Sequence, residues 1–547
     1  MLYRLDGIAR TSAPPLDPES PMSTPDARQT PAPASSPAPT PAPAPAPAPA
    51  RAGTRQWAAL VVLMLPVLLV SVDNTVLSFA LPEISTALRP SAAGQLWIVD
   101  VYSLVLAGLL VAMGSLGDRF GRRRLLLIGA SGFAAVSLAA AFAPTAEALI
   151  AARAVLGFFG AMIMPATLSL LRSTFTDRDQ RRLAIAIWAS GFAAGSALGP
   201  ILGGVLLEHF AWGSIFLIAA PVLLPLLIAA PLLVAESRDP APGPFDLVSV
   251  LLSLVAMAPV VAAIKQLATH GPGLDVLGLA VVGVTAGWLF VRRQLRRPRP
   301  LLDVRLFADP VFAGSIVVNL LAITSLVGFL FFTTQHLQLV VGLRPLHAAL
   351  TLLPGLVVMV VAGLAVVPIV RRVAPRSIVA VGLAAAGVAY GAVWLSGAGA
   401  PVWVFVVSFA LVGLGVGAAE TISNDLIIAA VPADRAGAAS AVSETAYEVG
   451  AVLGTAVLGS MLTAIYRGAL VVPDVVPGDA ASAARETLGG AVAAAGPLDP
   501  AAADALLAAA AHAFDTGLVA TAAVGAGIMA LAVVVALVCL RRASAHD

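Results

Sequence analysis

The sequence predicts an all-α polytopic membrane protein with fourteen transmembrane helices. Hydrophobic residues make up 59% of its 547 residues, and charged residues only 11%. Because a soluble domain carries about 25% charged residues, this chain is too poor in charge to cover a water-exposed surface. The mean hydropathy is +0.94. After Arg55, apolar windows of about 20 residues, the length that crosses a bilayer, follow one another closely.

The apolar windows define the expected spans in order. Their approximate ranges are 57–80, 95–116, 125–143, 147–171, 183–207, 212–234, 246–268, 274–292, 311–334, 348–370, 377–397, 402–430, 436–463 and 516–540. Residues 1–55 come before them. Their Pro-Ala repeats favour an extended conformation that buries nothing, so we predict a disordered cytoplasmic tail. Residues 467–515, between the last two spans, are predicted to form a long external loop, which is rich in alanine and can therefore be helical.

Basic residues orient these spans, because cytoplasmic loops of membrane proteins carry an excess of arginine and lysine. Loops after even-numbered spans hold Arg119, Arg122–Arg124, Arg172, Arg178, Arg181, Arg182, Arg238, Arg292, Arg293, Arg296, Arg297, Arg299, Arg305, Arg371, Arg372, Arg376 and Arg435. The opposite loops are predicted to hold only Arg89, Lys265, Arg344, Arg467 and Arg485. We therefore expect a multi-pass protein of the cytoplasmic (inner or plasma) membrane, with both termini in the cytoplasm.

Several classes of site are excluded by composition. Lys265 is the single lysine, and it does not lie in the Gly-Lys-Ser/Thr context of a phosphate-binding loop. Cys539 is the single cysteine, so neither an intrachain disulfide nor a cysteine-based metal site is expected. Neither a metal-ligand cluster nor a Gly-x-Ser-x-Gly nucleophile motif is found. The sequence therefore predicts no enzyme, no metal and no nucleic-acid partner.

Two glycine-containing motifs stand out. Within the span at 183–207, Gly191, Gly195, Gly199 and Gly203 recur every fourth residue, with Pro200 and Gly204 beside them. Such spacing places a strip without side chains on one helix face, where another helix can approach closely. The strip is interpreted as tight helix packing, as an interface that opens and closes during transport, or as both.

The second motif follows the second span. It contains Gly114, Gly117, Asp118, Arg119, Gly121, Arg122 and Arg123. Topology alone explains the arginines but not the glycines or the Asp118–Arg119 pair. Asp118 is expected either to accept hydrogen bonds from the start of a neighbouring helix or to pair with an arginine, and so to latch the cytoplasmic side.

Acidic residues inside the spans indicate the chemistry, because an ionised carboxylate at a helix centre costs about 2.5–3.5 kcal/mol. Burial favours the protonated form, so one carboxylate can hold either a proton or a cation, and the two compete. Asp73 lies in a polar cluster of the first span, and Asp100 lies about one turn inside the second. Alternatively, Asp73 belongs to a row of polar residues that packs against a neighbouring helix. Asp100 alternatively interacts with the helix dipole.

The span at 436–463 carries two acids on one face, since Glu444 and Glu448 are four residues apart. Tyr447, beside them, can offer a ring face to a cation. Ala446, Gly450 and Gly454 point away and are expected to pack against another helix. Glu420 is a further intramembrane acid, whereas Asp425 either shares that environment or lies at the interface. Arg153, the one clearly intramembrane arginine, is expected to face the first or second span.

Together these motifs resemble the major facilitator superfamily. The loop at 114–123 is similar to its signature loop, residues 191–204 to the fifth-helix motif of its antiporters, and Arg153 to their fourth-helix arginine. The number of spans, fourteen, is similar to that of the fourteen-helix drug:proton antiporter branch. The segments 96–108, 164–169 and 301–307 resemble those of quaternary-ammonium and methyl viologen exporters. Three positions depart from that pattern: Ser443 replaces a glutamate, Glu448 replaces an aspartate, and Met359 stands where some relatives carry an aspartate linked to divalent cations. Handling of divalent cations is therefore left open.

This resemblance implies two six-helix halves, at 56–240 and 301–547, with an inserted helix pair and linker at 241–300. It implies a proton-coupled antiporter that exports lipophilic, chiefly cationic, drugs or antiseptics and uses protons as the coupling ion without another cofactor. Asp73, Glu444 and Glu448 are the expected cation and proton sites, supported by Asp100. The expected partners are drug-like small molecules and the lipid bilayer, with the protein as a monomer.

Three other functions are weighed against this one. A dedicated exporter of a self-made natural product fits equally well, because the arginine and alanine bias suggests a G+C-rich genome in which such exporters are common. A proton-coupled uptake symporter is disfavoured by the glycine motif. A membrane-embedded enzyme is disfavoured by the missing catalytic motifs.

Overall fold

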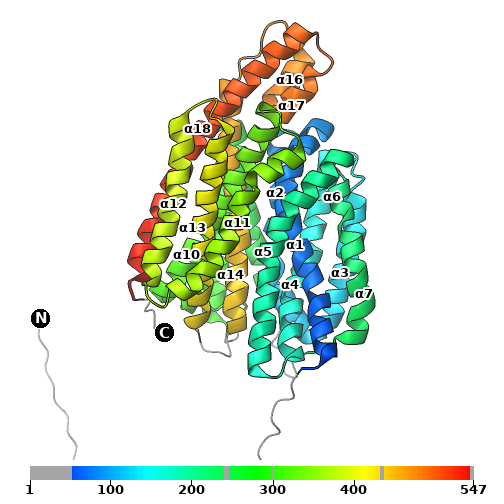
Figure 1. The fold of residues 1–547 in the computed structure, drawn as a ribbon, viewed down its shortest axis with the longest axis vertical. Helices are drawn as coiled ribbons and strands as arrows, with labels where there is room; N and C mark the ends of the chain where they lie inside the picture. Colours follow the sequence, from blue (N-terminus) through cyan, green and yellow to red (C-terminus); the bar gives the residue numbers. More distant parts are fainter. Residues whose placement is uncertain (1–51, 239–245, 299, 432–435, 543–547) are drawn as a thin grey trace, which may run out of the picture. The chain divides into compact units, whose positions relative to one another are not determined.

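The computed structural model describes residues 52–238, 246–298, 300–431 and 436–542. Helices and short connections make up these ranges, and no strand occurs in them (Figure 1). The all-α class is therefore confirmed. Of the predicted tail, only residues 52–55 fall within the described ranges, and Arg435 lies outside them.

The first part of the chain forms α1 (Thr54–Leu88), α2 (Ala92–Phe120), α3 (Arg122–Ala140), α4 (Ala146–Thr174), α5 (Arg178–His209), α6 (Ser214–Leu217) and α7 (Ala219–Leu233). Polar residues set where several of them begin. Ser91, Thr145 and Asp177 each accept a hydrogen bond from the backbone N–H three residues later, which caps α2, α4 and α5.

A helix pair follows, α8 (Leu247–His270) and α9 (Leu274–Arg296), then the short η1 (Val304–Ala308). The remaining elements are α10 (Pro310–Gln335), the π-turn η2 (His336–Val340), α11 (Pro345–Ile369), α12 (Pro375–Ser396), α13 (Val402–Ala429), α14 (Ala436–Leu453), the π-turn η3 (Gly454–Gly459), α15 (Ser460–Ala469), α16 (Gly478–Glu486), α17 (Leu488–Ala495), α18 (Pro500–Cys539) and η4 (Leu540–Arg542).

Every predicted span coincides with a helical segment. In the described ranges, 13 helices are long and apolar enough to cross a membrane by length and composition. The 32-residue α5 is not counted among those 13, and several of its residues have side chains outside the part of the chain that the structure describes. The number fourteen is thus not confirmed exactly. The last predicted span, 516–540, lies within α18, which begins at Pro500 and extends over 40 residues.

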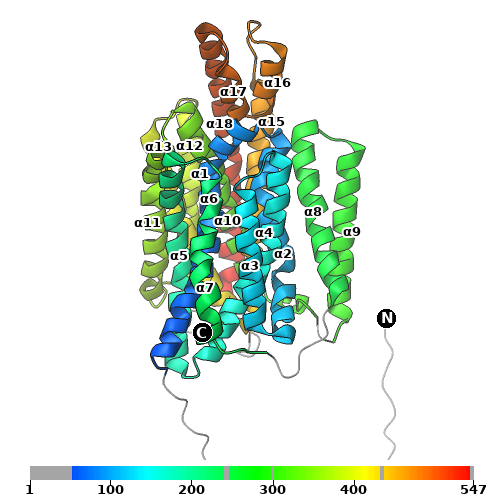
Figure 2. The ribbon, with the colours of Figure 1, turned by 90° about the vertical axis from the view of Figure 1, so that its right-hand side faces the viewer.

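Residues 49–547 form one compact unit, so the division into halves at 56–240 and 301–547 stays a prediction. Within this unit, α1 packs against α5 and α7, and α2 against α4, while α13 packs against α10, α11 and α12. Two interfaces join the helices of the first part of the chain, α1 to α7, to those of the second part, α10 to α18. In one, α5 contacts α11, and in the other, α2 contacts α14. The pair α8–α9 lies beside α2, as Figure 2 shows.

The ends of the bundle differ in their polar contacts. We call the end that carries α16 and α17 the hairpin end, and the end where α2 passes into α3 the arginine end. At the hairpin end, Gln95 of α2 donates to Gln335 of α10 at 2.9 Å, and Gln338 donates to the carbonyl of Phe79 at 3.0 Å. Glu486 of α16 accepts from the backbone N–H of Ala92. These contacts tie α1 and α2 to the second part of the chain.

Candidate functional site

A buried ion pair joins α4 to α1. Arg153 Nη1 lies 2.7 Å from Asp73 Oδ2, and Arg153 Nε donates to the backbone carbonyl of Ile98 in α2. The guanidinium also lies over the ring of Tyr102, 4.7 Å from its centroid. Arg153 is 1% exposed. The arginine therefore contacts both α1 and α2, and its charge is balanced by Asp73.

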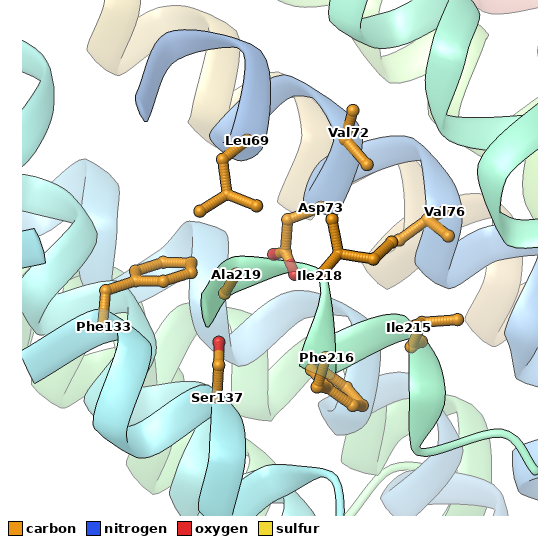
Figure 3. A pocket seen from close by; sticks show the side chains of 10 residues that line it. All are labelled: Leu69, Val72, Asp73, Val76, Phe133, Ser137, Ile215, Phe216, Ile218 and Ala219. Atoms are coloured by element: carbon orange, nitrogen blue, oxygen red, sulfur yellow. The ribbon is translucent and has the colours of Figure 1, made fainter. Parts of the chain in front are cut away.

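Asp73 also borders a small pocket between α1, α3 and the α6–α7 junction (Figure 3). The remaining lining is apolar except for Ser137 of α3. In Figure 3 the hydroxyl of Ser137 points toward the side of the pocket on which Asp73 lies. A single carboxylate thus faces an arginine on one side and a small pocket with mostly apolar lining residues on the other.

The acids of the second part of the chain lie close to this pair. Glu448 of α14 is 2% exposed, and its Oε1 is 3.5 Å from Asn74 Nδ2 in α1, the outer limit of a hydrogen bond. Glu444 is half-buried one turn away and has Glu448 and Glu420 as charged neighbours. Tyr447 is half-buried beside the same three acids.

Tyr102 is the common neighbour of both groups. Its buried side chain lies within electrostatic reach of Asp73, Glu448, Arg153 and Glu444. One cluster therefore contains carboxylates from α1 and from α14, which are 371 or more positions apart in the sequence. Asp425 does not belong to it, because its side chain is exposed near the arginine end of α13.

The opposite face of α14 packs as its small residues predict. A Cβ added at Gly450 would lie 2.7 Å from the carbonyl oxygen of Leu320, and one at Gly454 would lie 2.7 Å from that of Thr324. Both neighbours belong to α10. This close approach leaves Glu444 and Glu448 on the side that faces away from α10.

Asp100 has a different partner, which the sequence did not predict. Lys265 Nζ lies 2.8 Å from Asp100 Oδ2, and each side chain is 1% exposed. The assignment of Lys265 to an external loop is wrong, because the residue lies inside α8. A lone lysine near the end of an apolar window gives no signal of its buried partner, so pattern analysis counted it as a topology marker.

The loop at the arginine end is held by a residue that sequence reasoning missed. Asp118 pairs with Arg122 at 2.8 Å, one of the two predicted alternatives. Glu236, just after α7, accepts from the backbone N–H groups of Arg123 and Arg124 at the start of α3. Gly121, at φ +112°, lies so near that an added Cβ would be 2.8 Å from the Glu236 carboxyl carbon. A carboxylate at a helix N-terminus is favoured by the helix dipole.

Other loop-motif residues have simpler surroundings. Arg119 is exposed, and Arg123 donates to the carbonyl of Val234. Gly114 faces Pro165 of α4, while Gly117 faces Leu125 of α3. Among the contacts of these residues that the structure describes, none reaches the second part of the chain. The latch of the cytoplasmic side stays a prediction.

The glycine strip of α5 lies against α1. A Cβ at Gly195 would be 2.6 Å from Ser71 Cβ, and Gly191 and Gly199 approach Met64 and Thr75 even more closely. Gly203 contacts Val76, Pro200 is buried, and Gly204 instead faces Leu346 of α11, with a Cβ position 2.7 Å from its Cα. The motif therefore contacts both α1 and the opposing group of helices. Its role in transport stays a prediction.

A histidine–aspartate pair lies apart from these groups. His336 Nδ1 is 2.9 Å from Asp515 Oδ1 near the hairpin end. In the described ranges, no group of three or more His, Cys, Asp or Glu residues could hold a metal ion.

Comparisons with known proteins point in one direction. The family model described as Major Facilitator Superfamily matches residues 63–455. The chain is 56% identical to the multidrug efflux pump LfrA of Mycolicibacterium smegmatis over 90% of its own length and 98% of that protein's. It is 36% identical to the methyl viologen resistance protein SmvA of Salmonella typhimurium, covering 84% of this chain and 93% of SmvA.

Solved structures show the same fold at low identity. A bacterial homologue of the human lysosomal transporter Spinster, solved in an inward-facing and occupied conformation, matches with a TM-score of 0.61 and 17% identity. The match covers 90% of this chain and 98% of that one.

Proposed function

Because this chain belongs to the Major Facilitator Superfamily, we propose that it exports lipophilic cationic drugs in exchange for protons. The observation that carries the proposal is the cluster of buried charges around Tyr102. There Asp73 is paired with Arg153, and Glu448 approaches Asn74 from the other part of the chain. The kinship with the efflux pump LfrA and with SmvA supports drug-like substrates.

The chemistry of the cluster suits exchange of a cation for a proton. A buried carboxylate must have its charge neutralised by a proton, a cation or an ion-pair partner. Asp73 is paired with Arg153, whereas Glu444 has the acids Glu448 and Glu420 near it. Glu448 has Asn74 and Ser103 beside it, and Arg153 is within electrostatic reach. Glu444 and Glu448 are therefore the proposed binding sites for the cation, with Tyr447 beside them and Glu420 as a neighbouring acid.

Asp73 is the proposed proton carrier. Protonation of Asp73 would release Arg153, whose charge could then be balanced by Glu448. Because the two carboxylates come from different parts of the chain, moving the arginine between them would couple proton uptake to relative movement of the helices. The conformational change would occur where α5 slides against α1 and α11.

We further propose that the arginine end faces the cytoplasm, because loops rich in arginine are retained there. The hairpin end would then face outward. The protein would act as a monomer in the cytoplasmic membrane, with drug-like small molecules as its partners and no cofactor besides the coupling proton.

Dye efflux tests the proposal directly. Inverted vesicles that contain the protein should accumulate ethidium when their interior is made more acidic than the medium. The accumulation should stop when this proton gradient is collapsed. A matched preparation carrying Glu444→Gln and Glu448→Gln should not accumulate it. Transport that persists without a gradient would refute proton coupling. Movement of neither ethidium nor neutral drugs would favour an exporter dedicated to a single natural product.

A further inference from the structure

Lys265 reaches from α8 into a site built by α2. Its ammonium lies 2.8 Å from Asp100 Oδ2, donates to the backbone carbonyl of Leu96 at 3.1 Å, and sits over the ring of Trp97, 3.8 Å from the centroid. A carboxylate, a carbonyl and an indole face are the groups that recognise an organic ammonium ion. Lys265 therefore occupies a cation site that belongs to α2.

Because both charges are buried, either partner can leave this site only if another charge or a proton takes its place. Asp100 and Lys265 are each 1% exposed, so removing either partner would leave the other charge buried and unpaired. If Lys265 withdrew, Asp100 would need a proton or another cation in its place. The tethered ammonium thus competes for Asp100 with any cation that the protein carries.

The position of α8 makes such withdrawal feasible. The helix pair α8–α9 attaches through one face of α8, which packs against α2, η3 and α15. The side chains of Leu247, Leu251 and Val255 on α8 are exposed. A second polar link from α8 to α2 is made by Ser253, whose hydroxyl donates to the carbonyl of Gly108 at 3.1 Å. Moving α8 would disturb a narrow interface at the seam between α2 and η3.

We propose that Lys265 is an internal competing cation for the Asp100–Trp97 site, so that the inserted helix α8 controls when this site accepts a cationic substrate. With α8 in place, the site is closed to other cations. With α8 displaced, Asp100 exchanges the lysine for a proton or for a lipophilic ammonium ion. The identity of that ion as an exported drug rests on the proposed function.

Chemical rescue tests the site without any transport measurement. Lys265→Ala removes the propylammonium portion of the side chain, so n-propylammonium should restore it. We expect n-propylammonium to raise the thermal unfolding midpoint of purified Lys265→Ala by roughly 2 °C or more at saturation. n-Propanol, which lacks the charge, should not do so, nor should n-propylammonium act on wild type or on Lys265→Ala/Asp100→Asn. Equal responses in the single and double variants, or none in Lys265→Ala, would overturn the proposal.

A second variant keeps the test decisive if Lys265→Ala does not fold. Lys265→Met retains the volume and removes the charge, and we expect it to bind ethidium about tenfold more tightly than wild type. Adding Asp100→Asn should abolish the gain. Unchanged or weaker binding by Lys265→Met would refute competition. Failure of dye efflux in wild type, with the n-propylammonium response intact, would instead count against the proposed function alone.

Discussion

Arg153 of α4 and Asp73 of α1 form an ion pair, in which Nη1 lies 2.7 Å from Oδ2. The two residues are 80 positions apart in the sequence. The pair is in contact with Tyr102. Asp73 also borders the pocket toward α3 and α6. In the proposed mechanism, Asp73 takes up a proton when it releases Arg153, and the pocket lies beside the carboxylate that changes its protonation.

Asp73→Asn should abolish proton-coupled export while the protein still inserts into the membrane. The substitution keeps the shape of the side chain but leaves Arg153 buried without its counter-ion, a loss of about 3–5 kcal/mol for a buried pair. Ethidium uptake by energised inverted vesicles, normalised to protein in the membrane, should fall at least about tenfold. Asp425→Asn, at an exposed acid, is the matched control. Full export by Asp73→Asn would show that proton-coupled export does not require the Asp73 carboxylate.

Glu448→Gln should weaken cation binding more than binding of neutral drugs. Glutamine fills the same volume at a 2% exposed site but carries no charge to attract a cation. We expect the dissociation constant for ethidium to rise about tenfold, equivalent to about 1.4 kcal/mol. Fluorescence polarisation with purified protein measures it. Glu147→Gln, exposed in the first turn of α4, should leave binding unchanged; a loss of affinity in both variants would argue against a specific site.

Gly195→Ala should destabilise the contact of α5 with α1. The new methyl group would lie 2.6 Å from Ser71 Cβ and 2.8 Å from the backbone oxygen of Leu68, so the helices must move apart. Overpacking of this kind costs about 1–3 kcal/mol. A lower thermal unfolding midpoint is expected, whereas Gly278→Ala, with open space around its Cβ position, should not lower it. Equal midpoints for both variants would show that the strip tolerates side chains.

Asp246 predicts a pH dependence for the inserted helix pair. Hydrogen bonds from Arg293 hold the pKa of this carboxyl, just before α8, well below its usual range. Its stabilising contribution is therefore complete above the unfolded pKa of about 3.9 and is lost as the pH falls toward the lower folded value. Asp246→Asn should have a lower unfolding midpoint than wild type at pH 7, and the difference should shrink below about pH 4. A constant difference across this range would contradict the assignment.

Much of the architecture follows from local sequence patterns. Apolar windows predicted every helical span, because a membrane helix must be apolar over its own length, whatever packs against it. Helical periodicity also predicted that Gly450 and Gly454 face a neighbour while Glu444 and Glu448 face away. Family membership, predicted from the motifs, is confirmed by the family model and by the kinship with LfrA.

The partners of individual charges could not be predicted in the same way. Lys265 was assigned to a loop, and Glu236 was not recognised, because each acts through a residue more than 110 positions away in sequence. The start of α18 ahead of the predicted span could not be fixed from the sequence for another reason. Its first turns, from Pro500, contain Asp504 and many alanines, a composition that suits a helix outside the membrane as well as a loop.

The burial of Lys265 also gives the protein a natural chemical reporter. It is the only lysine in the sequence, so an amine-reactive label has one side-chain target besides the α-amino group. With α8 seated, the 1% exposed ammonium is shielded from the reagent. The labelling rate of unmodified protein therefore measures how often α8 lifts from α2, and mass spectrometry can read it in native membranes without engineered cysteines or attached dyes.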